Sequence, residues 1–153
     1  PAITVTLPAA DPPGVPGVGA RRPPDEDQRL ARLRALKLLN SPPEPIFDAC
    51  TRLAALVCDA PIAMVSVIDE HRQWFKSQVG LTGLQQTARD VAFCAHTILG
   101  DAVMEVPDAL ADTRFAGNPL VLGDPHIRFY AGTPLQPAPA HRAPRRSAQQ
   151  PAG

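Results

Sequence analysis

Cysteine and histidine are the side chains here best suited to nucleophilic or metal chemistry, and both occur in the segment Phe93-Cys94-Ala95-His96. Such a pair could act as a thiolate–imidazole couple, hold half of a metal site or attach a chromophore. On a helix, positions i and i+2 point about 200° apart, so Cys94 and His96 do not converge. The spacing therefore favours a structural or pocket-lining role for Phe93, Cys94 and His96, with redox or ligand-holding chemistry as the alternative.

The other two cysteines, Cys50 and Cys58, fall on one expected helix. Three cysteines at unrelated spacings predict neither a zinc site nor a disulfide framework. We therefore expect buried core thiols in a reducing cytoplasm, a reactive role being the alternative, and no metal or other cofactor.

Composition limits the packable region. The 153 residues carry no formal net charge and are 44% apolar, but ten of the 19 prolines lie in residues 1–45 and five in 134–153. We expect a disordered leader over residues 1–24, one domain over 25–135 and a disordered tail over 136–153. Zero net charge argues against general nucleic-acid binding. The sequence shows no secretory signal and no apolar run near the ~20 residues of a membrane span.

A β-hairpin is expected at the centre of this domain. The run Ile62–Ile68 is apolar on both alternating faces, which predicts a central strand covered on both sides. Asp69-Glu70-His71 forms a polar turn, and Arg72–Val79 returns with a wetter face, nearer a sheet edge.

Two helices should precede the hairpin. In residues 25–40 leucines recur at helical intervals, and Leu30 and Leu33 either cover the domain's own sheet or form a dimer seam. Asn40 should close this helix in a left-handed conformation. Ser41 and Glu44 form a capping-box pattern for the next helix. Its expected buried face is Ile46, Phe47, Cys50, Leu53, Ala54 and Val57.

After the hairpin the expected elements are short. A polar loop, residues 80–89, leads to a helix over 91–99 capped by Asp90. Residues 103–106 predict a strand, residues 113–122 a helical turn with an irregular loop, and residues 126–135 a half-buried strand. In that last strand Arg128 and Tyr130 should share the polar face.

The order of these segments resembles a GAF domain of the type found in bacterial sensor histidine kinases and in proteins that make or break cyclic di-GMP. The matching text covers about residues 28–135 and includes NSPPEPIFDACTRLAALVCDAPIAMVSVIDEHRQWFKSQVGL, RDVAFCAHTIL, VPDALADTRFAGNPLV and HIRFYAGTPL. Pigment-carrying relatives have a Cys beside a His, which this sequence lacks, so the resemblance is to the non-pigmented sensory type.

The resemblance implies an α+β fold, with a central antiparallel sheet, helices packed on one face and a ligand pocket on the other. It implies an unknown small-molecule ligand, a possible homodimer through the N-terminal helix, and a C-terminal output domain in a longer parent, which would be a two-component histidine kinase or a cyclic di-GMP enzyme. The ligand-binding candidates are Phe93, Cys94, His96, Asp108, Asn118, Arg128 and Tyr130.

The resemblance stops before the last strand and C-terminal helix of the family. In their place stands QPAPAHRAPRRSAQQPAG, with no apolar residue larger than Ala. We hypothesise that residues 136–153 are a frameshifted or truncated end, which would leave the central strand with an open edge. A chain in this state should be marginally stable.

Three functions remain open. The first is a sensing or signal-relay domain without catalysis of its own. The second is a dimerisation module without a ligand. The third is a thiol enzyme similar to the GAF-type methionine sulfoxide reductases, which would need two cysteines close together.

Overall fold

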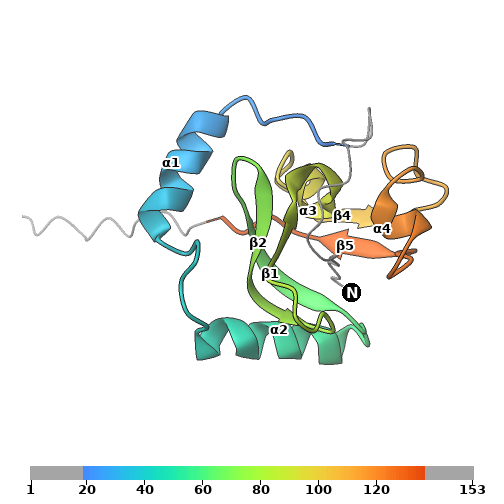
Figure 1. The fold of residues 1–153 in the computed structure, drawn as a ribbon, viewed down its shortest axis with the longest axis horizontal. Helices are drawn as coiled ribbons and strands as arrows, with labels where there is room; N and C mark the ends of the chain where they lie inside the picture. The colour runs from blue at the N-terminus through green and yellow to red at the C-terminus, as the bar shows by residue number, and fades with distance from the viewer. Residues whose placement is uncertain (1–18, 137–153) are drawn as a thin grey trace, which may run out of the picture.

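The computed structural model describes residues 19–136 (Figure 1). Its helices are α1 (Glu26–Leu36), α2 (Pro45–Val57), the 3₁₀ turn η1 (Arg89–Val91), α3 (Phe93–Thr97) and α4 (Pro119–Leu122). Its strands are β1 (Ala63–Ile68), β2 (Arg72–Val79), β3 (Gln86–Ala88), β4 (Met104–Val106) and β5 (Tyr130–Gly132). The predicted mixed α+β class is confirmed.

The strands form two antiparallel sheets. One has the order β1-β2-β3, and the other pairs β4 with β5. Helix α2 packs on one face of β1 and β2, while α3 contacts both β1 and β5. Figure 1 shows α2 beneath the larger sheet and α3 on the side of the β4-β5 pair. The layers agree with the expectation of helices on one face and a shorter helix with loops on the other.

The hairpin is confirmed, but the positions of its strands in the sheet are not as predicted. Strand β2 is the middle strand, because Gln86–Ala88, expected as loop, pairs with it as β3. Within residues 19–136 no strand pairs with the other edge of β1, so β1 is an edge strand. The supposedly wet strand β2 instead buries Gln73, Lys76 and Ser77.

A β-bulge explains how the neighbouring residues Lys76 and Ser77 are both buried on one side of the sheet. Val65 pairs with Ser77 and Ser66 with Phe75, so Lys76 has no partner across the hairpin. A bulge breaks the alternation of side chains between the two faces of a strand. Lys76 and Ser77 consequently both reach the α2 side, where Ser77 Oγ donates to Asp48 and Lys76 lies over the ring of Phe47.

Helix α1 is confirmed, but it ends at Leu36, with Lys37 in the left-handed region. Asn40 is left-handed as predicted, at φ 57°, although it lies beyond the helix. The predicted capping box of Ser41 and Glu44 is not formed. Helix α2 begins at Pro45 with Glu44 as its N-cap, and the Ser41 hydroxyl donates back to the carbonyl of Leu38.

The predicted buried face of α2 is right for Phe47 and Ala54 and wrong for its other four residues. Ile46, Cys50, Leu53 and Val57 are exposed, and the side toward the sheet carries Phe47, Thr51, Ala54 and Cys58. Thr51 is buried and its hydroxyl donates to Ser77 Oγ at 2.9 Å. Polar contacts to β2 therefore set the orientation of this helix.

The remaining elements differ in detail from expectation. Asp90 does not cap α3, which begins after Ala92 without a side-chain cap. The predicted strand over 126–135 is regular only at β5, where Tyr130 is buried rather than on a polar face. The strand predicted over 103–106 appears as β4.

The core lies between the two sheets and under α3 and α4. It is built from Leu81, Phe93, Val106, Ala109, Phe115, Leu120, Val121, Ile127 and Tyr130. Most of the predicted leader and nearly all of the predicted tail lie outside the described residues. Of the leader, residues 19–24 are placed, and Ala20 packs against the group formed by Ile68, Ala92 and Ala95.

Candidate functional site

Helix α3 carries the Cys–His segment, and most of its side chains face the core. The Phe93 ring stacks on Phe115 with 4.0 Å between ring centroids. Cys94 Sγ lies 3.4 Å from the hydroxyl of Tyr130, which also shares a 2.6 Å hydrogen bond with Thr97 Oγ1. These contacts give Phe93, Cys94 and Tyr130 clear structural roles.

Three other predicted ligand residues hold loop backbone in place. The carboxylate of Asp108 accepts from the backbone N–H of Leu110. Asn118 is buried and caps α4 by accepting from the N–H of Leu120, while its amide donates to the carbonyl of Val91. The guanidinium of Arg128 donates to the carbonyls of Val121 and Ile127.

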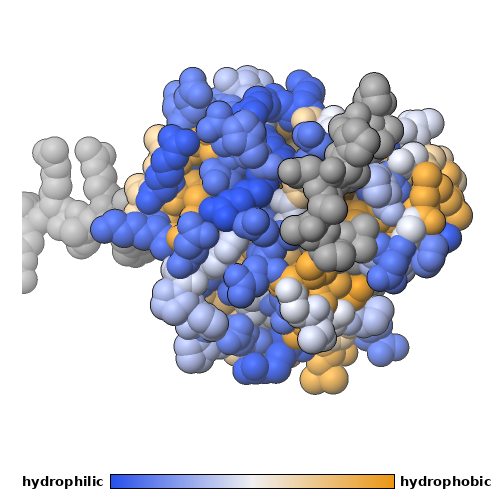
Figure 2. All heavy atoms as spheres, in the orientation of Figure 1, coloured by the Kyte–Doolittle hydropathy of each residue, from blue (hydrophilic) through white to orange (hydrophobic). Residues whose placement is uncertain are grey.

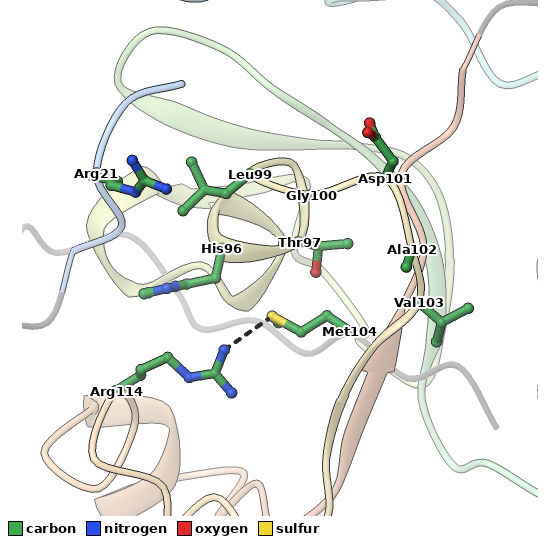
Figure 3. Close-up of a pocket in the computed structure, with 10 residues that line it drawn as sticks. All are labelled: Arg21, His96, Thr97, Leu99, Gly100, Asp101, Ala102, Val103, Met104 and Arg114. Atoms are coloured by element: carbon green, nitrogen blue, oxygen red, sulfur yellow. Dashed lines mark hydrogen bonds between the residues drawn. The ribbon is translucent and has the colours of Figure 1, made fainter. Parts of the chain in front are cut away.

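An open pocket of about 630 Å³ lies at the carboxyl end of α3 and along the loop that leads to β4 (Figure 3). It is lined by Arg21, His96, Thr97, Leu99, Gly100, Asp101, Ala102, Val103, Met104 and Arg114. Figure 3 shows Met104 and Arg114 directed toward each other across the lower part of this pocket, with the His96 ring above Arg114. The short helix α3 thus presents its core side to Phe115 and Tyr130 and its end to the pocket.

The guanidinium of Arg114 donates hydrogen bonds to a strong acceptor from two of its nitrogens and to a weak acceptor from the third. Its Nε and Nη2 donate to the two carboxylate oxygens of Asp112, at 2.9 and 2.6 Å. These hydrogen bonds lower the pKa of Asp112 and raise that of Arg114, so the pair is ionised at neutral pH. The remaining Nη1 points to Met104 Sδ at 3.6 Å. A thioether is a weak acceptor, so an oxyanion in the pocket would be a better partner for this N–H.

The lining is mixed, with charged, neutral polar and apolar groups. Arg21 and Arg114 contribute guanidinium groups, the latter paired with Asp112, and Asp101 contributes one acid. Within residues 19–136, Arg21 has no ion-pair partner. In Figure 3 the carboxylate of Asp101 points away from the basic side chains, at the opposite end of the pocket. Leu99, Val103 and Met104 supply the apolar surface, so the chemistry suits a small anion with an apolar or planar part.

Of the seven residues predicted to bind ligand, His96 lines this pocket and the other six do not. Sequence reasoning missed Arg21, Met104 and Arg114. Arg114 could have been found, because Asp112-Thr113-Arg114 places an acid two residues before a base in a loop, where the two can pair. Arg21 lay in a segment expected to be a leader, and nothing in its neighbours indicates a pocket.

Metal sites, cysteine pairs and membrane-spanning helices were also sought among the described residues. Between residues 19 and 136 no group of three or more His, Cys, Asp or Glu side chains is arranged to hold a metal ion. No disulfide joins the three cysteines, all of which lie within residues 19–136. Cys50 and Cys58 belong to α2 and its end, and Cys94 belongs to α3 on the other side of the sheet. None of the helices in this range is long and apolar enough to cross a membrane.

The architecture is that of a small α+β domain, and two comparisons give its family. The model of the GAF domain matches residues 42–136, so the chain belongs to the GAF domain family. The chain is also 45% identical over 116 residues to the cyclic di-GMP phosphodiesterase PA2567 of Pseudomonas aeruginosa strain PAO1. That match covers 76% of this chain and 20% of the relative, so the chain spans about one fifth of the relative's length. The chain is thus a sensory or signal-relay type of domain, similar to part of a cyclic di-GMP signalling protein.

Proposed function

We propose that this chain is the ligand-sensing part of a signalling protein, and that the pocket at the end of α3 binds a small organic anion. The observation that carries the proposal is the solvent-accessible Nη1 group of Arg114, which faces the pocket and whose protein hydrogen-bond acceptor, among residues 19–136, is the weak thioether of Met104. The guanidinium of Arg21 on the same lining adds to the attraction for an anion.

The route from the pocket to the rest of the domain is short. His96 packs edge-on against Phe115 at 4.8 Å between ring centroids, and Phe115 stacks on Phe93 in the core. Thr97, also on the lining, is hydrogen-bonded to Tyr130 of β5. A ligand that shifts the end of α3 would therefore move side chains that pack against both sheets, which is the requirement for signal relay.

The output function is inferred from the relative. Because the similar protein is named a cyclic di-GMP phosphodiesterase, we propose that the longer parent of this chain makes or breaks cyclic di-GMP. A histidine kinase parent is the alternative. In either case the chain contributes sensing, and catalysis belongs to the output domain. The parent acts in the cytoplasm, where both kinds of output domain find their substrates.

A guanine nucleotide titration tests the binding proposal. 5′-GMP, inorganic phosphate and neutral guanosine are added separately to the chain, and the backbone amide signals of Gly100 and Asp101 are followed by NMR. We expect both signals to shift with GMP, weakly with phosphate and not with guanosine. Arg114→Gln should weaken GMP binding roughly tenfold, whereas Arg32→Gln on the exposed side of α1 should not.

Two results would reject the binding proposal. One is the absence of any shift at millimolar GMP and phosphate. The other is equal binding of GMP and guanosine, because the anionic group would then contribute nothing. Far-UV circular dichroism of both variants checks that the fold is intact.

A further inference from the structure

The two methionines of the chain, Met64 and Met104, lie in different surroundings. Both are partly exposed and pack against the edge of the hydrophobic core, but of the two only Met104, the first residue of β4, also lines the pocket. The surface on this side of the molecule is mixed: where Figure 1 places α4 and the loop before it, Figure 2 shows hydrophobic and hydrophilic atoms side by side. A small oxidant dissolved in water can therefore reach Met104 through the open pocket.

The polar group beside each sulfur atom also differs. Gln73 Nε2 donates to Met64 Sδ at 3.5 Å, but the same nitrogen donates to Ser66 Oγ at 2.8 Å, so this neutral amide already has a good acceptor. Met104 Sδ instead accepts at 3.6 Å from Nη1 of Arg114, whose guanidinium carries a full charge. A charged donor forms its strong hydrogen bonds with oxygen, and a thioether is a weak substitute.

The guanidinium of Arg114 is held in place on its other sides. Its Nε and Nη2 donate to the two carboxylate oxygens of Asp112 at 2.9 and 2.6 Å, and the group lies over the ring of Phe115 at 5.1 Å. These contacts fix the plane of the guanidinium and direct Nη1 toward the sulfur of Met104, as Figure 3 shows. An oxygen atom added on this side of the sulfur would therefore meet an N–H that is already in position.

We propose that Met104 is a modification site for peroxide, at which the thioether is oxidised to a sulfoxide whose oxygen accepts the hydrogen bond from Arg114 Nη1. A lone pair of Met104 Sδ attacks one oxygen of hydrogen peroxide, and the O–O bond breaks. The departing hydroxide takes the proton of the transferred oxygen and leaves as water. Sulfur thus loses two electrons, peroxide gains them, and no further reactant is needed.

The distances suit this product. With an N–H···O length of about 2.9 Å and a bent angle at the oxygen, the sulfur of a sulfoxide lies about 3.9 Å from the donor nitrogen. The distance from Met104 Sδ to Arg114 Nη1 is 3.6 Å, so the sulfoxide forms with a small movement of the side chain. Peroxide that enters between the two groups also accepts from Nη1, which directs attack to one lone pair of the sulfur. Because a sulfoxide sulfur is chiral, we expect mainly one of the two epimers.

The modification would regulate the pocket, and this part of the inference rests on the proposed function. A sulfoxide on Met104 occupies the N–H of Arg114 that an anion would otherwise use, so oxidation weakens anion binding. Methionine sulfoxide is converted back to methionine by reductases, so the block is reversible. Binding at this site would then depend on the oxidant as well as on the ligand.

Peptide mass spectrometry of the full 153-residue chain, sampled during exposure to hydrogen peroxide, tests the site. Dithiothreitol added to each sample reverses cysteine sulfenic acids and disulfides and leaves methionine sulfoxide in place. We expect Met104 sulfoxide to form roughly tenfold faster than Met64 sulfoxide, which is the internal reference. In denaturant the two methionines should oxidise at equal rates. Equal rates in the folded chain would overturn the proposal.

The ratio of the two epimers tests the role of Arg114. The oxidised peptide that contains Met104 is treated separately with the two methionine sulfoxide reductases, which repair opposite epimers. We expect one enzyme to repair most of the sulfoxide from the unsubstituted chain, and each to repair about half of it from Arg114→Ala. Arg32→Ala, at an exposed position of α1, is the matched control and should keep the excess. Circular dichroism verifies that both variants are folded. Equal epimers in the unsubstituted chain, or an excess that survives Arg114→Ala, would also overturn the proposal.

Binding of 5′-GMP then tests the regulation. The oxidised chain should bind GMP roughly tenfold more weakly than the reduced chain. Met64→Leu should show the same loss on oxidation, and Met104→Leu should show none. Equal binding by the oxidised and reduced chains would refute the regulation. A reduced chain that binds no GMP would reject the proposed function instead, and the oxidation rates and epimer ratio would still decide whether Met104 is the modification site.

Discussion

Glu26 is a buried carboxylate shared by two guanidinium groups. Arg29 donates two hydrogen bonds to it at 2.8 and 2.9 Å, and Arg89, itself buried, donates from Nη1. The bonds from Arg29 and then those from Arg89 outweigh burial and lower the pKa of Glu26 from 4.5 to about 2. Since Arg29 also donates to the carbonyl of Ile68, this cluster fixes the first turns of α1 to the end of β1.

We predict that Glu26→Gln lowers the free energy of unfolding by about 3 kcal/mol at pH 7, because it leaves Arg89 buried without its counter-charge. Urea denaturation measures the loss. The control is Asp27→Asn at the exposed neighbouring position, which should change the free energy of unfolding by less than about 0.5 kcal/mol.

The same carboxylate predicts the acid response. A pKa lowered in the folded state means that the stabilisation is complete above about pH 4.5 and is lost as the pH falls toward 2. The parent chain should therefore lose stability over this interval more steeply than Glu26→Gln. The free energy of unfolding of both proteins is measured by urea denaturation at pH 5, 4 and 3. An equal loss in the two proteins over this range would contradict the account.

Gly132 is required by close packing against Tyr130. A Cβ at position 132 would overlap the Tyr130 hydroxyl and lie 2.7 Å from its Cζ. The ring cannot withdraw, because Tyr130 is buried and bonded to Thr97. We predict that Gly132→Ala costs about 1–3 kcal/mol, measured by urea denaturation. Gly117→Ala, where no heavy atom lies within 4 Å, is the control, and equal effects of the two substitutions would refute this explanation.

At the scale of elements, the bulge at Lys76 ties β2 to the loop before α2. The Lys76 side chain is fully buried, and its ammonium contacts Glu44 at 2.5 Å, Ser41 Oγ at 2.7 Å and the carbonyl of Pro42 at 2.8 Å. Lys76→Met should cost about 3 kcal/mol and speed amide exchange in the loop, because three polar groups lose their partner. The exposed Lys37→Met should leave both stability and exchange unchanged. Thermal melts and hydrogen exchange by mass spectrometry measure the two effects.

Much of the element order could be predicted from the sequence. An apolar run, a polar turn and a second extended run located the hairpin, and leucine spacing located α1. The orientation of α2 could not be predicted, because its two faces are both partly apolar and hydrogen bonds from Thr51 and Asp48 to a distant strand decide between them. The order of strands was missed for a related reason. Gln86–Ala88 has no apolar pattern of its own and becomes a strand only by pairing with β2.

The candidate site was predicted less well than the fold. Helix α3 was singled out for its cysteine and histidine, and the structure does place it between core and pocket. The basic residues of the pocket come from segments about 90 residues apart, Arg21 and Arg114, which only the folded chain brings to one lining. The roles of Asp108, Asn118 and Arg128 in binding a ligand stay predictions, and their observed bonds are to loop backbone.

At the scale of the whole molecule, one edge of β1 is unpaired within residues 19–136. In this range β1 pairs only with β2, and the β4-β5 pair is a separate sheet. We predict a broad thermal transition by calorimetry, with a van't Hoff enthalpy different from the calorimetric one, and fast amide exchange in β1. Sharp, well-dispersed NMR signals with strong protection throughout residues 62–68 would show that this edge is closed in solution.

Signal relay is the central claim for the whole molecule, and a chimaera tests it most directly. The matched residues of this chain replace their counterparts in the Pseudomonas phosphodiesterase, and cyclic di-GMP hydrolysis is measured with and without 5′-GMP. An Arg114→Gln chimaera separates the effect of the pocket from any inhibition of the catalytic domain by GMP. We predict that GMP changes the rate of the first chimaera and leaves a much smaller effect in the second. Equal responses of the two active chimaeras would mean that the pocket does not report to the output domain.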